Sequence, residues 1–159
     1  MGSLERLVAL LIITMCTSVT MSLAQNVIAT PNLDNQNTTV VIYNDLGDDL
    51  PLRFHCQSRD VDLGSQHLAA GGSWSFEFKP SASGDTIYAC LFGWKLEFHY
   101  FRIYRQDRDK ESSLHGCTRC EWKIHKDGPC QLNNVTKMID HCPPWDSSQF
   151  SKNNLPLFI

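Results

Sequence analysis

Apolar and polar side chains alternate along most of this chain, and the period is two rather than the helical one. Residues 40–43 are apolar at every position, as expected of a strand buried on both faces. Residues 50–56 follow an Asn/Asp/Gly turn cluster at 44–49 and carry Leu, Phe and Cys on one face. Two such runs with a turn between them predict a β-hairpin.

The same alternation recurs through the body of the chain, with turn residues about every 8–12 positions. Polar residues 58–66 form a loop in this interpretation, followed by a short strand at 67–68. The remaining predicted strands are Trp74–Phe78, Ile87–Phe92, Phe98–Tyr104 and Cys120–Ile124. About seven to eight short strands, with no internal repeat and no useful helical pattern, predict an all-β sandwich or barrel. Of the two we expect a single-domain antiparallel β-sandwich, stabilised by disulfides.

The amino-terminal residues have a different pattern. Residues 7–13 form an apolar run that is too short to cross a bilayer, which needs about 20 apolar residues. Arg6 precedes the run, and the small residues Ser22 and Ala24 stand where a signal peptidase would cut before Gln25. This predicts a secretory signal peptide, with a buried amino-terminal helix as the alternative.

The expected organisation follows from that cleavage. It comprises a signal peptide at 1–24, an amino-terminal segment at 25–38, the β-sandwich at 39–132 and a carboxy-terminal extension at 133–159. We expect the last dozen residues of the extension to be poorly ordered. No second apolar run approaches membrane length, so the mature protein is expected outside the cell without membrane insertion.

Seven cysteines are many for a chain of 159 residues. Cleavage after residue 24 would remove Cys16 and leave an even number in an oxidising compartment, where thiols pair. The disulfide candidates are Cys56, Cys90, Cys117, Cys120, Cys130 and Cys142. Their connectivity stays open at this stage, because spacing alone does not select partners.

Cys117 and Cys120 have the spacing of a C-x-x-C motif. In another compartment it would indicate half of a zinc site or a redox pair. No second C-x-x-C supplies further ligands, so we expect each of these cysteines to be bonded to a different, distant partner. A bridge closing a long loop, such as one from Cys56 to Cys130, would contribute about 4–5 kcal/mol through chain entropy. Cys142 is expected to tie the start of the tail to the body.

The net charge of −3 argues against a general nucleic-acid binder, which needs an excess of basic side chains. Acidic side chains gather between residues 34 and 62, and basic ones between 95 and 126. Such a dipolar surface suits a protein partner, because complementary charge gives specificity and a fast association rate. An ordinary mixed surface is the alternative. Two sequons make Asn37 and Asn134 candidates for N-glycosylation.

Candidate catalytic groups form no recognisable constellation in the sequence. The six histidines are spread over strands and loops, and local spacing places no two on one surface, as a two-histidine ribonuclease would need. Aspartates at 45–49 and 60–62 would suit Ca²⁺, but they lack the spacing of a full calcium loop and are more typical of turns. We therefore expect no enzyme activity, no metal and no cofactor.

Several short motifs follow one another in unbroken order between Thr39 and Cys130. They are Val40-Val41-Ile42-Tyr43-Asn44-Asp45-Leu46, Leu52-x-Phe54-His55-Cys56-x-Ser58-x-Asp60-x-Asp62-Leu63-Gly64, Gly72-x-x-Trp74-x-Phe76-x-Phe78, Tyr88-x-Cys90-x-Phe92-x-Trp94, Cys120-x-Trp122-x-Ile124 and Asp127-Gly128-Pro129-Cys130. Together they resemble the plant self-incompatibility S-protein homologue family. The resemblance implies a small secreted β-sandwich stabilised by disulfides. The family cysteines map onto Cys56, Cys90, Cys120 and Cys130, whereas Cys117, Cys142 and the tail depart from the family pattern and would add a third bridge.

Founding members of that family act as secreted stigma ligands that trigger rejection of self pollen through a pollen receptor. The resemblance therefore implies a secreted, non-enzymatic signalling ligand, in self-incompatibility or in another plant cell–cell signal. We expect a monomer that binds a cell-surface receptor through loops between strands, here 45–49 and 107–112. The receptor-binding candidates are Asp45, Asp48, Asp49, Asp107, Arg108, Asp109 and Lys110.

The alternative is a secreted defence protein. It would be either a hydrolase such as a ribonuclease or a carbohydrate-binding module with exposed Trp74, Trp94 or Trp122. We expect these tryptophans mainly in the core, which disfavours the sugar-binding alternative.

Overall fold

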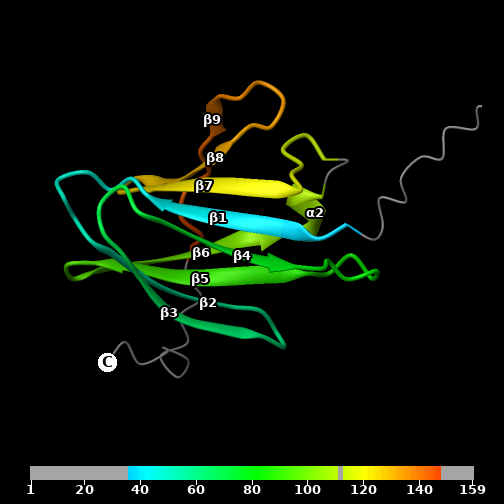
Figure 1. The fold of residues 1–159 in the computed structure, drawn as a ribbon, viewed down its shortest axis with the longest axis horizontal. Coiled ribbons are helices and arrows are strands. Elements are labelled where there is room, and N and C mark those ends of the chain that lie inside the picture. Colours follow the sequence, from blue (N-terminus) through cyan, green and yellow to red (C-terminus); the bar gives the residue numbers. More distant parts are fainter. Residues whose placement is uncertain (1–35, 111–112, 148–159) are drawn as a thin grey trace, which may run out of the picture. The chain divides into compact units, whose positions relative to one another are not determined.

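The computed structural model describes residues 36–110 and 113–147, which form an almost entirely β fold (Figure 1). The predicted signal peptide and the last dozen residues lie outside this part. The strands within it are β1 (Thr38–Asn44), β2 (Leu52–Gln57), β3 (Asp62–Leu68), β4 (Ser73–Phe78), β5 (Ile87–Trp94), β6 (Glu97–Arg105), β7 (Arg119–His125), β8 (Gly128–Leu132) and β9 (Ile139–His141). One short helix, α2 (Gln106–Asp109), follows β6.

The strands form two sheets that enclose one core. The first sheet has the order β4-β1-β7-β8-β9, and the second has the order β3-β2-β5-β6. The expected β-sandwich is confirmed. Neighbouring strands are antiparallel, except that β1 and β7 run parallel. Among the described strands this pair is the departure from a purely antiparallel arrangement.

The predicted hairpin of the first two strands is wrong. β1 pairs with β4 and β7, whereas β2 pairs with β3 and β5 in the other sheet. The segment 45–51 therefore crosses from one sheet to the other. Alternation marks which face of a strand is apolar, but it does not name the partner strand, which the packing of the two sheets decides.

Three strands depart from the prediction. β3 begins at Asp62, within the segment 58–66 that was expected to be a loop, and it ends with the short strand expected at 67–68. β8 and β9 lie where no strand was predicted, β9 within the predicted carboxy-terminal extension. β3 and β9 are edge strands of their sheets. An edge strand with solvent on its outer side needs few apolar residues, so its sequence gives a weak signal.

The core lies between the inner faces of the two sheets. Phe101 of the second sheet meets Trp122 of the first edge to face, with ring centroids 5.1 Å apart, a geometry that aromatic pairs favour. Trp122 is 0% and Trp94 3% exposed, while Trp74 is partly buried and packs against the same cluster. These tryptophans lie in or against the core, as expected.

Three disulfides pair the six described cysteines that the sequence analysis named. Cys56–Cys90 joins directly opposed residues of β2 and β5. Cys130–Cys142 joins β8 to the chain after β9, so Cys142 ties the tail to the body as expected.

The third disulfide joins Cys117 to Cys120. The expectation that each has a distant partner is therefore wrong, and so is the suggested bridge from Cys56 to Cys130. The backbone N–H of Cys117 donates to the Asp109 carbonyl oxygen at 2.9 Å. This short bridge anchors the segment between α2 and β7 and does not join remote strands.

After β9 the chain packs back against the second sheet. Asp146 accepts hydrogen bonds from the backbone N (2.8 Å) and Nε (3.0 Å) of Arg102 on β6. Partial burial opposes ionisation of Asp146, but the bonds from Arg102 outweigh it and hold the pKa of this carboxyl below its ordinary value. Next to it, the Trp145 ring stacks on His99 with centroids 4.8 Å apart. Part of the predicted extension is thus integral to the sandwich.

Candidate recognition surface

Four connections between strands meet at one end of the sandwich, seen at the left of Figure 1. They are 45–51 (β1 to β2), 69–72 (β3 to β4), 95–96 (β5 to β6) and 126–127 (β7 to β8). We name this surface the loop face. The first predicted recognition loop, with Asp45, Asp48 and Asp49, lies on it.

One buried side chain at the end of β1 organises the loop face. Asn44 is 2% exposed, and its amide nitrogen lies 2.8 Å from the carbonyl oxygen of Leu50, 3.2 Å from that of Leu68 and 3.0 Å from that of Ala69. Its side-chain oxygen accepts a bond from Leu46 N at 3.3 Å. The side chain thereby holds two of the four connections together. Sequence reasoning placed Asn44 in a turn cluster and missed this role.

Opposite charges join the 45–51 connection to the β7–β8 hairpin. Lys123 Nζ lies 3.3 Å from a carboxylate oxygen of Asp45, and Lys126 Nζ lies 2.5 Å from one of Asp48. The hydrogen bond and charge of Lys126, helped by the charge of Lys95, hold the pKa of Asp48 below its ordinary value. The acidic and basic parts of the sequence therefore meet on one surface. Because these pairs are exposed, they orient the connections more than they stabilise the fold.

Non-glycine residues of the loop face adopt left-handed backbone conformations. The φ angle is 52° at Asp48 and at Asp49, and 49° at Lys95. Aspartate tolerates this region, but it is uncommon for lysine, and such residues cluster at functional sites. In the β5–β6 turn the next residue, Leu96, is 93% exposed. The turn therefore presents an apolar side chain on an ordered backbone.

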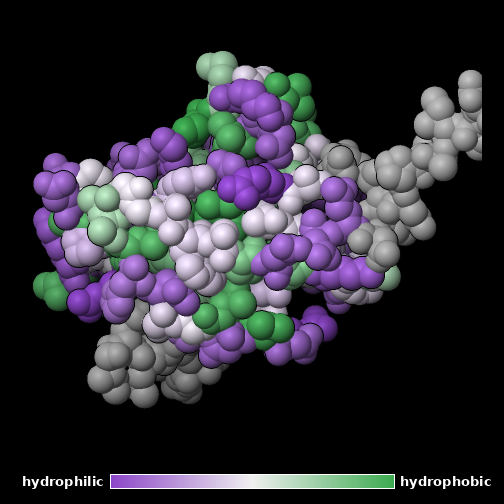
Figure 2. Space-filling model, viewed as in Figure 1, coloured by the Kyte–Doolittle hydropathy of each residue, from purple (hydrophilic) through white to green (hydrophobic). Residues whose placement is uncertain are grey.

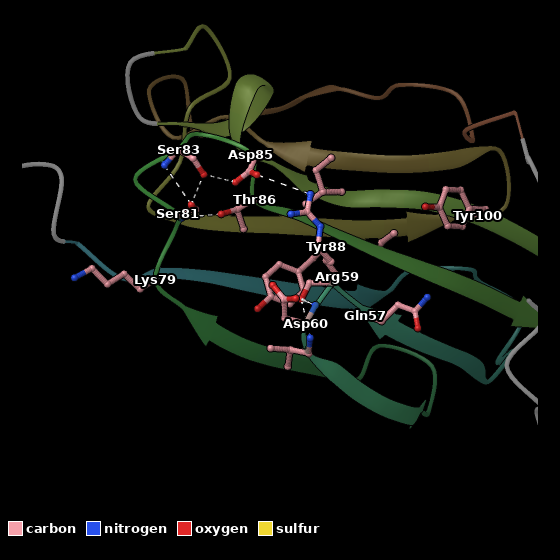
Figure 3. A pocket seen from close by; sticks show the side chains of 14 residues that line it. Gln57, Arg59, Asp60, Lys79, Ser81, Ser83, Asp85, Thr86, Tyr88 and Tyr100 are labelled. Atoms are coloured by element: carbon pink, nitrogen blue, oxygen red, sulfur yellow. Dashed lines mark hydrogen bonds and ion pairs between the residues drawn. The ribbon is translucent and has the colours of Figure 1, made fainter.

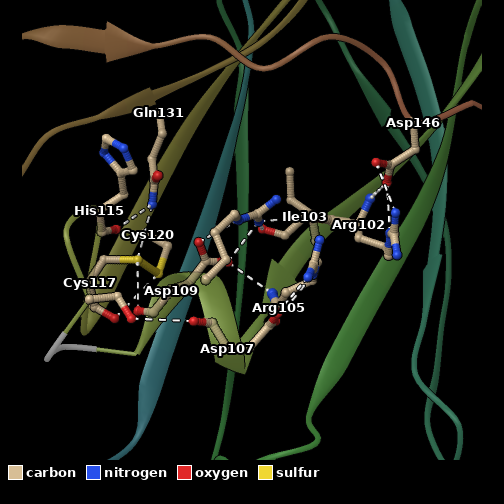
Figure 4. A network of polar contacts seen from close by, with 12 residues as sticks. Arg102, Ile103, Arg105, Asp107, Asp109, His115, Cys117, Cys120, Gln131 and Asp146 are labelled. Carbon is tan, nitrogen blue, oxygen red and sulfur yellow. Dashed lines mark hydrogen bonds and ion pairs between the residues drawn. A yellow bond between two sulfur atoms is a disulfide. The ribbon is translucent and has the colours of Figure 1, made fainter.

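The structure describes residues 107–110 of the second predicted recognition loop, 107–112, and these four do not form the fully exposed loop that their charges suggested. Its first residues belong to α2, and Asp109 is 0% exposed. The buried carboxylate accepts hydrogen bonds from Arg105 N at 2.9 Å and from Arg108 Nε at 2.6 Å (Figure 4). The prediction of a receptor contact is wrong for Asp109, because an ion pair inside the fold satisfies its charge.

Arg108 completes this network on the core side. Its guanidinium carbon lies 5.2 Å from the centre of the Phe101 ring and 4.9 Å from that of Trp122, within range of a cation–π contact. The side chain is 17% exposed. Of the four candidates in this segment, Asp107 and Lys110 are the exposed ones. The segment packs against the sandwich as a structural element.

The fold brings together two histidines that lie far apart in the sequence. The rings of His115 and His141 stack with centroids 3.9 Å apart and an interplanar angle of 14°. Burial, followed by the charges of His115 and Arg108, lowers the pKa of His141. A pair of histidines acting as general acid and base must have the substrate between them, and stacked rings leave no such space.

His55 lies between a serine and an aspartate, but its two ring nitrogens face them the other way round from the histidine of serine hydrolases. Its Nδ1 lies 3.2 Å from Ser65 Oγ, and its Nε2 lies 2.6 Å from Asp62 Oδ1 without hydrogen-bond geometry. In serine hydrolases the aspartate holds Nδ1, and Nε2 faces the serine. The cluster links β2 to β3 and lacks the arrangement that activates a nucleophile.

The aspartates considered for Ca²⁺ do not converge. Those at 45–49 lie on the loop face, whereas those at 60–62 lie at the connection between β2 and β3. Within residues 36–110 and 113–147, no three His, Cys, Asp or Glu side chains form a group that could hold a metal ion. The same residues include no helix that is long and apolar enough to span a membrane.

The two sequons occupy different surroundings. Asn37 is exposed before β1 and donates to Glu77, whereas Asn134 is half-buried between β8 and β9. Beside Asn134, Val135 is 89% and Met138 64% exposed. Hydrophobic residues gather there, at the top of Figure 2. Glycosylation of either asparagine stays a prediction.

The two sheets and three disulfides define a small, disulfide-bonded β-sandwich protein. Residues 39–145 match the family described as plant self-incompatibility protein S1, and the chain belongs to this family. The match extends past Cys130, where the motif resemblance ended, and includes Cys142. As a member of the family the protein is secreted, in agreement with its paired cysteines.

Relatives of similar length occur in Arabidopsis thaliana. S-protein homolog 2 is 40% identical over 151 residues, which cover 89% of this chain and 93% of the relative. S-protein homolog 3 is 41% identical over 109 residues, which cover 69% of this chain and 73% of the relative. A solved structure of self-incompatibility protein homologues, described as a widespread family of small, highly stable, secreted plant proteins, is 26% identical with a TM-score of 0.48. That match covers 70% of this chain and 96% of the solved one.

Proposed function

We propose that this protein is a non-enzymatic signalling ligand whose loop face binds a cell-surface receptor. Pollen–pistil self-incompatibility is one process that would use such a ligand, and other plant cell–cell signals would use it in the same way. The observation that carries the proposal is the loop face itself, because connections from both sheets are fixed there into one exposed surface.

The order of this surface favours binding. Docking of a mobile loop costs conformational entropy, and a loop that is already fixed avoids most of that cost. On the loop face, Asn44 holds the backbone from within, while the pairs of Asp45 with Lys123 and of Asp48 with Lys126 hold it from outside. Sequence changes at the exposed positions would then alter the partner without altering the fold.

Leu96 supplies an apolar contact among these charges. Charged groups at the rim of an interface mainly set specificity and association rate, whereas a few buried side chains supply most of the affinity. Leu96 is 93% exposed at the tip of the β5–β6 turn, and Lys95 next to it is close enough to influence Asp48. A receptor with a pocket for Leu96 and flanking charges of both signs would fit this surface.

Substitution of two exposed leucines tests the proposal. Leu96→Asp should weaken saturable binding of the mature protein to plasma-membrane vesicles from the responding tissue by about tenfold or more, as expected for a central interface residue. Leu114→Asp is the matched control, because Leu114 is 88% exposed between α2 and β7, away from the loop face. Both variants should unfold at the wild-type denaturant midpoint.

Two results would contradict the proposal. One is equal binding by wild type and Leu96→Asp, and the other is equal weakening by the two leucine variants. Prior treatment of the vesicles with protease should abolish the binding, since the expected receptor is a protein. A turnover of RNA or glycan that disappears on substitution of single histidines would instead favour a secreted hydrolase.

A further inference from the structure

A polar groove of about 630 Å³ lies at the end of the sandwich opposite the loop face (Figure 3). Its rims are the connections 58–61 (β2 to β3) and 79–86 (β4 to β5), and Tyr88 and Tyr100 also line it. The strands that start at the loop face, such as β2, end at this groove. Small-molecule sites have volumes of about 300–1,000 Å³, and the proposed function makes no use of this one.

Hydroxyl groups on one rim are fixed by bonds among themselves. Ser83 Oγ lies 2.6 Å from Ser81 Oγ and donates to Asp85 Oδ1 at 2.6 Å. Thr86 Oγ1 accepts a bond from Ser81 N at 2.7 Å. The bond from Ser83 holds the pKa of Asp85 below its ordinary value, so this side chain is a carboxylate. The rim therefore presents an ordered row of hydroxyls that ends in an anionic acceptor.

Charged side chains of both signs line the groove. Arg59 Nη2 lies 3.8 Å from Asp85 Oδ2, and the two side chains are 80% and 53% exposed. Asp60 and Lys79 add one acid and one base, so the charges of the lining cancel. A guanidinium beside a carboxylate offers a donor next to an acceptor, which suits a ligand hydroxyl because it both donates and accepts.

Apolar surface interrupts these polar groups. Val61 and Ile87 are 45% and 43% exposed, and both line the groove with Tyr88. Burial raises the pKa of Tyr100, so its hydroxyl stays protonated and can donate as well as accept. Sugar rings have the matching pattern, with hydroxyls around the edge and C–H groups on the faces.

We propose that this groove binds a neutral saccharide chain. The ring faces would contact Val61 and Ile87, and the ring hydroxyls would bond to Arg59, Asp85 and the neighbouring serines. Because the charges of the lining cancel, the groove offers an acidic sugar no net attraction. A wholly apolar ligand would leave the charges and hydroxyls of the lining without water or partners. The sequence analysis tied sugar binding to exposed tryptophans, whereas this groove contains none among its described lining residues.

The inference is independent of the receptor proposal. The loop face and the groove lie at opposite ends of the strands, so a saccharide would not block access to Leu96. A secreted protein with both surfaces could be retained on a neutral polysaccharide of the extracellular matrix while its other end stays free for a receptor. A negative result in the receptor test would therefore leave the saccharide proposal standing, and a negative result in the saccharide test would leave the receptor proposal standing.

NMR titration of the mature, disulfide-bonded protein tests the groove. The probes are cellohexaose, xylohexaose and mannohexaose as neutral chains, and hexagalacturonate as the acidic chain. We expect saturable shifts of the amide signals of 58–61 and 81–86 with at least one neutral probe. Hexagalacturonate should bind more weakly, and the signals of the loop face should not move.

Arg59, in the connection that follows β2, provides the variant, and Arg53, in β2 itself, provides the control. Arg59→Ala should weaken binding of the effective probe by about tenfold, the effect of losing about 1.4 kcal/mol. Arg53→Ala should leave it unchanged, because Arg53 is exposed near the start of β2, at the loop-face end. Both side chains are exposed, so both variants should fold.

The proposal would be overturned by any of three results. These are no saturable shifts with any neutral probe, tighter binding of hexagalacturonate than of every neutral chain, and equal effects of the two arginine substitutions.

Discussion

Single buried polar residues set the geometry of the exposed surfaces in this protein. Asn44 is the clearest case, since its side chain bonds to backbone groups of Leu46, Leu50, Leu68 and Ala69. The pattern of apolar and polar residues does not reveal this role, because an asparagine at the end of a strand gives the same pattern whether its side chain faces solvent or the interior. The Asn44 side chain stabilises the fold because it donates hydrogen bonds to backbone carbonyl groups that would otherwise be buried without a donor.

Substitution of Asn44 should therefore destabilise the whole domain. Asn44→Ala removes the amide donor and leaves backbone carbonyls unsatisfied, and we expect it to lower the free energy of unfolding by about 2–4 kcal/mol. Urea denaturation of the unglycosylated, oxidised protein measures this. Asn37→Ala is the control, because the exposed Asn37 side chain should contribute within about 0.5 kcal/mol. Equal stability of the two variants would show that Asn44 does not organise the loop face.

At the scale of elements, α2 shows how a charged run can be structural. Its sequence, QDRD, has the composition of a solvated turn. In the fold, Asp109 and Arg108 form an ion pair between the helix and the core aromatic rings, while Asp107 pairs with Arg105 at the surface. Asp107 and Asp109 look equivalent in the sequence, but the fold exposes Asp107 and buries Asp109.

The two aspartates of α2 should respond very differently to neutralisation. Asp109→Asn leaves the Arg108 charge buried without its partner, which should cost about 3–5 kcal/mol. Asp107→Asn removes an exposed pair with Arg105 and should cost at most about 1 kcal/mol. Thermal unfolding followed by near-ultraviolet circular dichroism distinguishes the two. A small effect of Asp109→Asn would mean that the ion pair is not needed to hold α2.

At the scale of the whole molecule, contacts between distant segments close the sandwich. The stack of His115 on His141 joins the segment before β7 to β9, and Trp145 packs on His99 of β6. Each disulfide except Cys56–Cys90 lies next to one of these segments. Closure therefore depends on residues that lie after the last strand predicted from the sequence.

The partly buried histidine stack should make the fold sensitive to acid. The pKa of His141 is lowered in the folded state by burial and by His115 and Arg108, which outweigh Asp109 and Asp140. The unfolded chain therefore takes up a proton below a pH of about 6.5, the ordinary pKa of histidine, before the folded chain does. The free energy of unfolding should fall as the pH drops from there through the lowered pKa of His141.

A phenylalanine substitution isolates this effect. His141→Phe keeps an aromatic ring on His115 but cannot take up a proton, so stability should fall less between about pH 7.5 and about pH 5 than in the wild type. Guanidinium denaturation at several pH values measures the difference. His67→Phe, on exposed β3, should keep the wild-type dependence. An unchanged pH dependence in His141→Phe would contradict the assignment.

The sequence by itself determined the strands with apolar faces, the oxidised state expected of the cysteines, the family and the loop at 45–49. These follow from local alternation, counts and motif order. Only the tertiary structure decided that β1 pairs with β4 and β7, that Cys117 bonds to Cys120, that Asp109 is buried and that a groove forms at 58–61 and 79–86. A period of two is the same for every partner strand, and the burial of a charge depends on which distant residues pack around it.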